Sequence, residues 1–186
     1  MARMPEHPEI ETLPELYACW PEPFQKLGPY AQAVMRSDAP LSPGERELIA
    51  AYVSALNSCT YCYGVHSETA RQFKMDPGML NALMENPDTA PVSEHMKPIL
   101  AYVRVLTETP SRATDRHTQA IRDAGWNDDA IVYTVAATGY FNMMNRLVDG
   151  LGLVLKEGYA EKAGAMIAKV GYAGLGNSAA AQSNEK

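Results

Sequence analysis

The sequence predicts an all-α protein that folds as a single domain. Helix-start signals divide most of the chain into segments of helical length, and no segment shows the alternation of apolar and polar residues that indicates a strand. The chain has 186 residues, of which 46% are hydrophobic, and this is enough to bury a sizeable core. The lack of predicted strands also disfavours a thioredoxin fold, in which a redox cysteine pair follows a β-strand.

The N-terminal residues differ from the rest because prolines interrupt them. Pro5, Pro8 and Pro14 fall within residues 1–20, and a proline lacks the N–H group that a helix interior needs. We therefore expect residues 1–20 to form an irregular arm. A helix over residues 23–36 should follow it.

Two neighbouring helices are predicted next. A capping box at Ser42 and Glu45 predicts a helix over residues 43–56. The chain then breaks and restarts, and we expect Ser58 to cap a second helix over residues 59–73. Because the connection is short, the two helices should pack as antiparallel neighbours.

The second half of the chain is also predicted to be helical, with starts at Pro, Ser or Asn and with Gly near several ends. We expect helices over residues 76–84, 93–108, 113–124, 127–147 and 160–169. Residues 21–170 then make up the domain. Residues 171–186 are rich in Gly, Ala and Ser and are predicted to form a flexible tail.

Composition and charge exclude several classes of function. The net charge of −6 and the absence of a Lys/Arg run argue against a nucleic-acid partner. The longest apolar stretches, such as residues 131–141, are too short to span a membrane. The first residues lack the apolar segment of a signal peptide, and three cysteines do not make a secreted disulfide framework. We therefore expect a cytoplasmic protein.

The most informative motif is Cys59-Thr-Tyr-Cys62-Tyr-Gly-Val-His66, which stands twelve residues after Glu47. On a helix, positions 59, 62 and 66 share one face because offsets of three, four and seven return to nearly the same side. Two sulfurs, an imidazole and a carboxylate could therefore meet at one site. This pattern predicts a thiol redox centre.

Each of these side chains has a chemical role in such a centre. The thiolate is the nucleophile, so a group must lower a thiol pKa or accept its proton. Cys59 would sit in the first turn of its helix, where free N–H groups favour an anion. His66 lies four residues after Cys62 and is the natural base for it, and Glu47 could fix the imidazole directly or through a water. One cysteine would attack and the other would resolve.

A zinc site is the main alternative interpretation of the same residues. Cys59, Cys62, His66 and Glu47 could supply four ligands. Against this, the chain has no second CxxC pair and no pair of histidines at zinc-binding spacing, and structural zinc usually takes more sulfur or histidine.

Glu47, followed by eleven residues and then Cys59-x-x-Cys62-x-x-x-His66, resembles the core signature of the alkyl hydroperoxidase D-like superfamily, which also holds the carboxymuconolactone decarboxylases. A Tyr-Phe-Asn-x-x-Asn-Arg segment at residues 140–146 adds a similarity to its peroxidase-related branch. The resemblance covers about residues 20–165. It implies an all-helical domain with the CxxC pair at the start of a helix, an assembly of identical subunits, and disulfide-linked peroxide reduction without a metal or haem cofactor.

The resemblance also assigns roles to single residues. It makes Cys62 the thiol that attacks the peroxide, Cys59 its disulfide partner, and His66 with Glu47 the proton relay. The helix-end argument differs, since it favours Cys59 as the more acidic thiol. The founding hydroperoxidases carry a second histidine between the cysteines where this chain has Tyr61, which puts the same relay and the same reductant in doubt.

Three further residues are candidates for lining a pocket. Tyr61 lies inside the motif, and Asn142 and Arg146 form a polar stripe with Asp149 on an otherwise apolar helix. The stripe could line the pocket or a subunit interface, or it could be a network within the helix.

The function predicted from the sequence is thus a thiol-dependent peroxidase. Its substrate would be a hydroperoxide, its electron donor a thiol or a lipoyl-type group, and its assembly a homo-oligomer. Two alternatives remain. A disulfide redox switch would use the same thiols without efficient turnover, and a carboxymuconolactone decarboxylase-type enzyme would not need the thiol pair.

Overall fold

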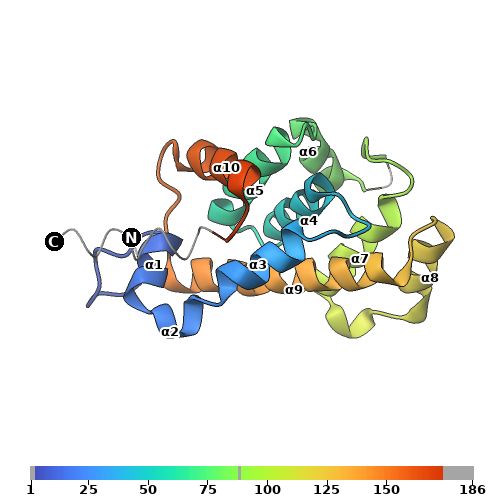
Figure 1. The fold of residues 1–186 in the computed structure, drawn as a ribbon. Helices are drawn as coiled ribbons and strands as arrows, with labels where there is room; N and C mark the ends of the chain where they lie inside the picture. The colour runs from blue at the N-terminus through green and yellow to red at the C-terminus, as the bar shows by residue number, and fades with distance from the viewer. Residues whose placement is uncertain (1–2, 88, 174–186) are drawn as a thin grey trace.

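The computed structural model describes residues 3–87 and 89–173, and within them it contains helices and no strand. The prediction of an all-α fold is confirmed (Figure 1). The helices are α1 (Leu13–Cys19), α2 (Pro21–Phe24), α3 (Leu27–Arg36), α4 (Pro43–Leu56), α5 (Thr60–Gln72), α6 (Pro77–Glu85), α7 (Lys97–Glu108), a short 3-10 helix η1 (Pro110–Arg112), α8 (Asp115–Asp123), α9 (Asp128–Leu151) and α10 (Tyr159–Val170).

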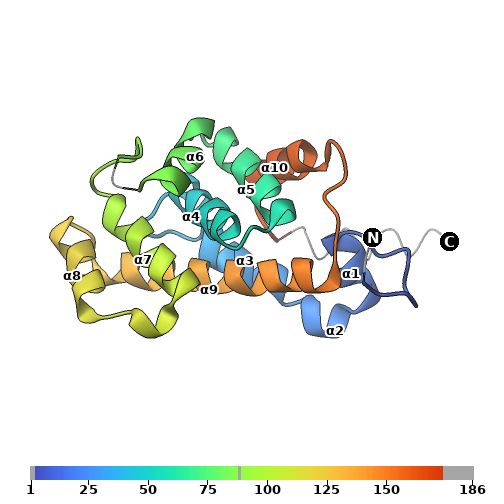
Figure 2. The same ribbon diagram turned by 180° about the vertical axis from the view of Figure 1, so that it is seen from behind.

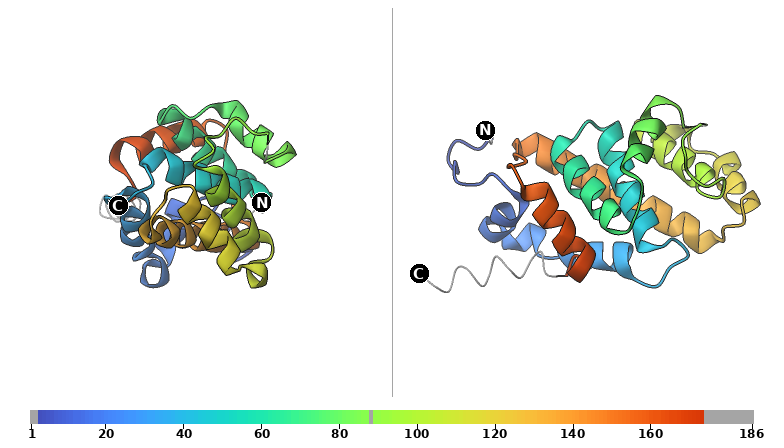
Figure 3. Two further views of the ribbon diagram at one scale, coloured as in Figure 1. Left: turned by 90° about the vertical axis from the view of Figure 1, so that its right-hand side faces the viewer. Right: turned by 90° about the horizontal axis from the view of Figure 1, so that it is seen from above.

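The longest helix, α9, runs along one side of the molecule, and shorter helices pack over it (Figures 1 and 2). Helix α5 packs between α4 on one flank and α10 on the other, and α4 also packs on α9. Helices α7 and α8 lie at the end of the molecule opposite α1, as the view from above shows (Figure 3). The thiol motif on α5 is therefore enclosed by α4, α9 and α10.

Helix α4 is the most deeply buried element. Ser42 and Glu45 form the predicted capping box, with Pro43 at the first helical position, so the helix begins where the sequence predicted. Most of its side chains are buried, and these include the charged residues Arg46 and Glu47. A buried charge needs partners, and the partners of Glu47 belong to the candidate site.

The described part of the N-terminal arm is irregular over residues 3–12, but the prediction is wrong for residues 13–19, which form α1. Thr12 and Glu15 form a capping box at the start of α1, and Pro14 falls in the first turn, where a proline does not interrupt helical hydrogen bonds. Ile10 and Leu16 are buried in the core. Residues 1–20 were expected to lie apart from the domain, but the described part of this segment packs into it.

The single helix predicted over residues 23–36 is instead divided into α2 and α3. Pro29 has no N–H group with which to continue the hydrogen bonding of the preceding turn.

The first residues of the predicted flexible tail are ordered. Gly171 to Ala173 follow α10 as an ordered segment, and the Tyr172 side chain is only 3% exposed. Residues 174–186 lie outside the described residues. Within the described part of the chain, no helix has both the length and the apolar character needed to cross a membrane.

Candidate thiol redox site

The two cysteines of the motif lie together at the N-terminus of α5. Cys59 is the N-cap residue and Cys62 is the third residue of the helix, so both are next to N–H groups that have no partner within the helix. The sequence predicted that Ser58 would cap the helix. It does not, because it adopts a left-handed conformation with φ of 57°. Both thiols are free and buried, with exposures of 0% and 3%. Helix position therefore gives Cys59 little advantage over Cys62 as the more acidic thiol.

The surroundings of Cys62 favour the neutral thiol. Its pKa is raised, first by its hydrogen bond with Cys59, next by burial, and also by the nearby charges of Cys59 and Asp149. The hydrogen bond with Asn145 acts in the opposite direction and lowers the pKa of Cys62. Because only a thiolate is a good nucleophile, this thiol needs a group that takes its proton when a substrate arrives.

Glu47 and His66 form a buried pair beside the thiols. The Glu47 Oε2 atom lies 2.9 Å from Nδ1 of His66, so the contact is direct. Burial by itself raises the pKa of Glu47, but the hydrogen bond and charge of His66, together with Arg36 and Tyr172, outweigh it and hold the pKa below its ordinary value. An ionised Glu47 accepts a hydrogen bond from the Nδ1–H group, which in a neutral imidazole leaves Nε2 as the basic nitrogen.

Two further residues complete the surroundings of Glu47. The Arg36 guanidinium donates to Glu47 Oε1 at 2.6 Å, and the Tyr172 hydroxyl donates to the same oxygen at 2.7 Å. Arg36 in turn lies between the rings of Phe73 and Tyr172, at 5.2 and 5.0 Å from their centroids. Every oxygen of this fully buried carboxylate therefore has a partner, as a buried charge requires.

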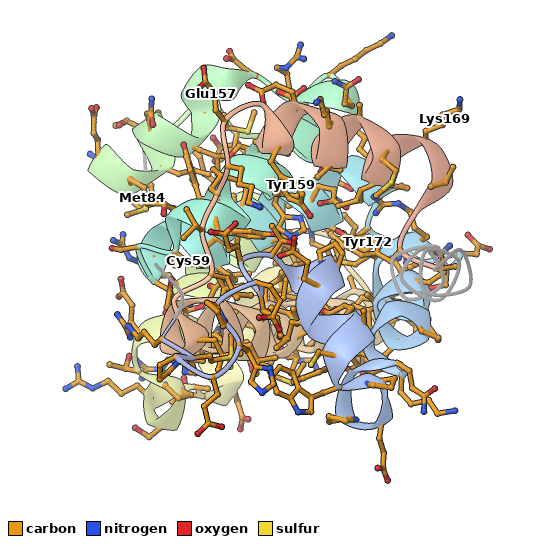
Figure 4. The ribbon with its side chains drawn as sticks, turned by 90° about the vertical axis from the view of Figure 1, so that its left-hand side faces the viewer. Cys59, Met84, Glu157, Tyr159, Lys169 and Tyr172 are labelled. Carbon is orange, nitrogen blue, oxygen red and sulfur yellow. The ribbon has the colours of Figure 1, made fainter. Side chains whose placement is uncertain are left out.

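A small cavity of about 60 Å³ connects Cys62 with His66. Most of its wall is apolar, and the rest is provided by tyrosines and by these two residues. Its lining residues are Leu13, Pro14, Tyr17, Tyr61, Cys62, Val65, His66, Tyr140, Phe141, Met144, Tyr159, Ala163, Ile167 and Tyr172. In Figure 4, Tyr159 and Tyr172 lie between α10 and α1, which cover this end of the molecule. The space is large enough for a few water-sized groups but not for a bulky ligand.

Among the residues that the structure describes, Cys62 and His66 line this cavity together without a direct hydrogen bond between them. The sequence predicted His66 as the base for Cys62, and the structure has both groups facing the same space. A proton can pass between them through a small molecule held in the cavity. The cavity thus joins the nucleophile and the base.

The opposite side of the thiol pair is formed by neutral amides. Asn145 is 1% exposed, and it donates to Ser54 Oγ at 3.1 Å and accepts from the side chain of Asn57 at 2.9 Å. Asn57 also donates to Asn142 at 3.1 Å, and Arg146 donates to the same Asn142 oxygen at 2.8 Å. This group of Ser54, Asn57, Asn142, Asn145 and Arg146 is called the amide network below.

The structure separates the three candidates for pocket residues. Tyr61 lines the cavity, and its hydroxyl accepts a hydrogen bond from the backbone N–H of Leu13. Asn142 and Arg146 do not line it, because they project from α9 toward a surface hollow beside Thr107 and Pro110. Within this chain, Asn142 hydrogen-bonds to Asn57, Thr107 and Arg146.

Several residues of the site escaped the sequence analysis. Arg36 and Tyr172 stand eleven and 125 residues from Glu47, and no local spacing links them to it. The sequence did contain a signal for Asn145, because this residue is the second asparagine of the segment at residues 140–146. No group of three or more His, Cys, Asp or Glu side chains in residues 3–87 and 89–173 is arranged to hold a metal ion.

Comparison with known proteins agrees with this geometry. The model of the carboxymuconolactone decarboxylase family matches residues 21–92, which include Glu47, both cysteines and His66. An uncharacterized peroxidase-related protein from Silicibacter sp. TM1040 is 28% identical, with a TM-score of 0.73 over 80% of this chain and 78% of that one. Residues 21–92 match the carboxymuconolactone decarboxylase family, and the fold of the chain is that of alkyl hydroperoxidase D-like, peroxidase-related proteins.

Other solved structures share this fold. A peroxidase-related protein from Ralstonia eutropha JMP134, with an alkylhydroperoxidase AhpD core, is 24% identical and has a TM-score of 0.73 over 80% of this chain and 78% of that one. The debrominase Bmp8, solved with 2,3,4-tribromopyrrole, is 15% identical and has a TM-score of 0.68 over 82% of this chain and 80% of that one. The fold therefore serves more than one activity. No curated protein matches the sequence.

Proposed function

We propose that this protein is a thiol-dependent peroxidase that cycles through a disulfide between Cys59 and Cys62. The observation that carries the proposal is that Cys62 and His66 face one cavity, with Cys59 in the same first turn of α5 as Cys62 and with Glu47 hydrogen-bonded to His66. A nucleophile, a resolving thiol and an oriented base are the three parts that the reaction needs.

The first step is an attack by Cys62 on a hydroperoxide. Nε2 of His66 takes the thiol proton through the bound substrate or a water, and the thiolate attacks the terminal peroxide oxygen. The O–O bond breaks, the leaving alkoxide takes the proton back as an alcohol, and Cys62 becomes a sulfenic acid. Two electrons pass from the sulfur to the peroxide.

The second step closes the disulfide. The thiol of Cys59 attacks the sulfenic sulfur of Cys62, an S–S bond forms, and the hydroxyl leaves as water with the Cys59 proton. A dithiol donor, either a small thiol pair or a lipoyl-type group, then reduces the disulfide by exchange. The position of both cysteines in the first turn of α5 supports this assignment, because it places the resolving thiol near the attacking one.

Peroxide consumption with dithiothreitol or a dihydrolipoyl donor tests the proposal. The wild type should turn over, and Cys62→Ser should reduce the rate at least a hundredfold because its oxygen is a far weaker nucleophile. Cys59→Ser should let Cys62 form a sulfenic acid once, visible by mass spectrometry, but should not cycle through an internal disulfide. Equal slow rates in the wild type and Cys62→Ser would remove the enzyme hypothesis.

A disulfide redox switch is the second candidate, and the burial of the thiols favours it. With exposures of 0% for Cys59 and 3% for Cys62, a bulky reductant cannot reach either sulfur in this conformation. Slow re-reduction would make the oxidised protein long-lived. A switch would show one rapid oxidation followed by reduction over many minutes, whereas a peroxidase would show steady turnover.

A decarboxylase is the less favoured candidate. Its substrate would carry carboxylates, whereas the described residues that line the cavity include no Lys or Arg to bind them. The thiol pair would also have no role in that reaction.

We also propose that identical subunits assemble through the outer face of α9. Val132, Val135 and Met143 are exposed on one stripe of this helix, with exposed Gly139 between them. A second copy of the chain would cover these apolar groups. Sedimentation velocity should show a species heavier than the 20.3 kDa chain, and a monomer at micromolar concentration would contradict this proposal.

A further inference from the structure

The segment that follows α10 reaches back to the thiol site. Residues 171–173, called the C-terminal strap below, leave the helix at Gly171, which has a φ of 73°. The Gln32 Oε1 atom accepts from the backbone N–H of Tyr172 at 2.7 Å and from that of Ala173 at 3.3 Å. A Cβ at Gly171 would overlap the Gln32 side chain, so this close approach requires glycine. The strap is therefore held in place by a specific clip.

The clip brings Tyr172 onto the Glu47–His66 pair. The Tyr172 hydroxyl lies 2.7 Å from Glu47 Oε1 and 3.4 Å from Nδ1 of His66. The Tyr172 ring stacks on the imidazole with a centroid distance of 6.3 Å and an interplanar angle of 16°, and it also lines the cavity. Burial and the neighbouring Glu47 raise the pKa of Tyr172 well above its ordinary value, so the phenol keeps its proton and acts as a donor.

The two oxygens of the Glu47 carboxylate have different hydrogen-bond partners. Oε2 faces His66, whereas Oε1 accepts from both Arg36 and Tyr172. With both donors present, Oε1 is satisfied and Oε2 is left for the imidazole. Without the phenol, one direction around Oε1 would be open and the carboxylate could rotate away from His66.

We infer that Tyr172 is a positioning residue of the proton relay, which holds the Glu47 carboxylate so that Glu47 fixes the ring of His66. The inference rests on the relay proposed above, and it adds a residue from the C-terminal strap to it. Tyr172 acts through Glu47 and His66 and does not transfer the substrate proton itself.

The pH dependence of Cys62 reactivity is the measurement that distinguishes positioning from packing. Several titratable and charged groups surround the relay from α1, α3, α4, α5, α9, α10 and the strap. They are Tyr17, Arg36, Arg46, Tyr61, Cys62, Tyr140, Tyr159 and Tyr172. Among the described residues, the side chains that hydrogen-bond to the Glu47 carboxylate are those of Arg36, His66 and Tyr172.

Tyr172→Phe tests the inference because it removes the hydroxyl and keeps the ring that stacks on His66 and Arg36. Alkylation of Cys62 by iodoacetamide, followed by mass spectrometry across a pH series, reports thiolate formation without any peroxide. Loss of a hydrogen bond to a charged group should reduce the alkylation rate near pH 7 about tenfold and move the acid limb of the profile up by about one pH unit. An unchanged profile in a folded Tyr172→Phe protein would overturn the inference.

Tyr133→Phe is the matched control. Its hydroxyl lies 2.9 Å from Ser37 Oγ and its ring does not line the cavity. The same loss of one phenol hydrogen bond should leave the Cys62 profile unchanged. If both variants shift the profile equally, the effect is a general loss of packing and the inference fails.

Gln32 provides a second test that remains useful if Tyr172→Phe does not fold. Gln32→Ala removes the oxygen that clips the strap, whereas Gln32→Glu keeps an acceptor oxygen there. We expect the acid limb of the profile to move up in Gln32→Ala and to stay near its original position in Gln32→Glu. A folded Gln32→Ala protein with the original profile would overturn the inference.

These outcomes are separable from the proposed function. A shifted alkylation profile without peroxide turnover in the wild type would support the role of Tyr172 and remove the peroxidase proposal. Peroxide turnover by the wild type with an unshifted alkylation profile in Tyr172→Phe would support the peroxidase proposal and remove the role of Tyr172.

Discussion

On the His66 side of the thiol pair, ionisable groups are hydrogen-bonded to one another and buried. On the Asn145 side, amides and a hydroxyl lie closest, and the charged groups, Arg146 and Asp149, are exposed at its edge. The first side joins Glu47, His66 and Arg36 around a cavity that a small substrate can enter. The second side joins Asn145 to Asn57 and beyond by hydrogen bonds between fixed dipoles. In the proposed reaction, protons move on the His66 side, and the amides on the other side hydrogen-bond to their neighbours without taking part in proton transfer.

Glu47→Gln should have the largest effect of the variants that test this contrast. It leaves Arg36 with a neutral partner and removes the charge that orients His66, so unfolding should become easier by about 3 kcal/mol at pH 7. Because the pKa of Glu47 is depressed in the folded protein, its contribution is present above the unfolded-state pKa of about 4.3 and is lost as the pH falls through the lower, folded-state pKa. Urea denaturation at pH 7 and at low pH should therefore show a difference between wild type and variant that shrinks with acid.

Glu108→Gln is the control for that experiment. Glu108 is exposed and pairs only with Arg104 among the described residues, and an exposed pair of this kind contributes less than about 0.5 kcal/mol. If Glu47→Gln lowers the free energy of unfolding no more than this control does, the buried charge of Glu47 does not stabilise the fold more than an exposed charge does.

Asn145→Ala should have an intermediate effect and tests the neutral side. Its amide lowers the pKa of Cys62 in the native protein, so its loss should raise that pKa further and slow alkylation near neutral pH by about threefold to tenfold. The rise in the alkylation rate of Cys62 with pH should therefore occur at a higher pH than in the wild type. Stopped-flow or timed alkylation with mass spectrometry at Cys62 measures this.

Asn142→Ala is the partner variant, because it disrupts the same amide network without being a group that shifts the pKa of Cys62. Its stability should fall by about 1 kcal/mol, and its alkylation profile should remain that of the wild type. Equal profiles for Asn142→Ala and Asn145→Ala would show that the network acts only through packing.

Ser58→Gly should have the smallest effect and should leave both sides intact. Ser58 is exposed in the turn between the amide network and Cys59, with a φ of 57° that disfavours a side chain. Glycine should stabilise the fold by about 0.5 kcal/mol after its greater freedom in the unfolded chain is included. A thermal unfolding curve measures this, and a lower melting temperature would mean that the serine side chain has an unrecognised role.

The sequence predicts the elements of this protein better than it predicts the partners within them. Helix α4 begins at Ser42 and Glu45 as expected because a capping box is a local signal. The Glu47–His66 contact was also predicted, since a short connection places α4 and α5 side by side. Local spacing thus identified the middle of the site.

What the sequence did not predict depends on distant parts of the chain. Arg36 comes from α3 and Tyr172 from beyond α10, and neither has a spacing rule that ties it to Glu47. Prolines in the first twenty residues were expected to prevent a helix, but Pro14 falls in the first turn of α1, where proline is tolerated. The N-cap was expected at Ser58 from residue preference, and the turn instead places Ser58 in the left-handed region and Cys59 at the cap.

The clip between Gln32 and the residues after α10 has a practical consequence for recombinant work. A chain shortened to end at Val170 would retain the helices described above but lose Tyr172, so far-UV circular dichroism would show a helical protein although the thiol site lacked one of its walls. A fusion partner joined directly at that helix end would have the same effect. Any affinity tag should therefore be attached well past Ala173, or at the other terminus, before the reactivity of the cysteines is measured.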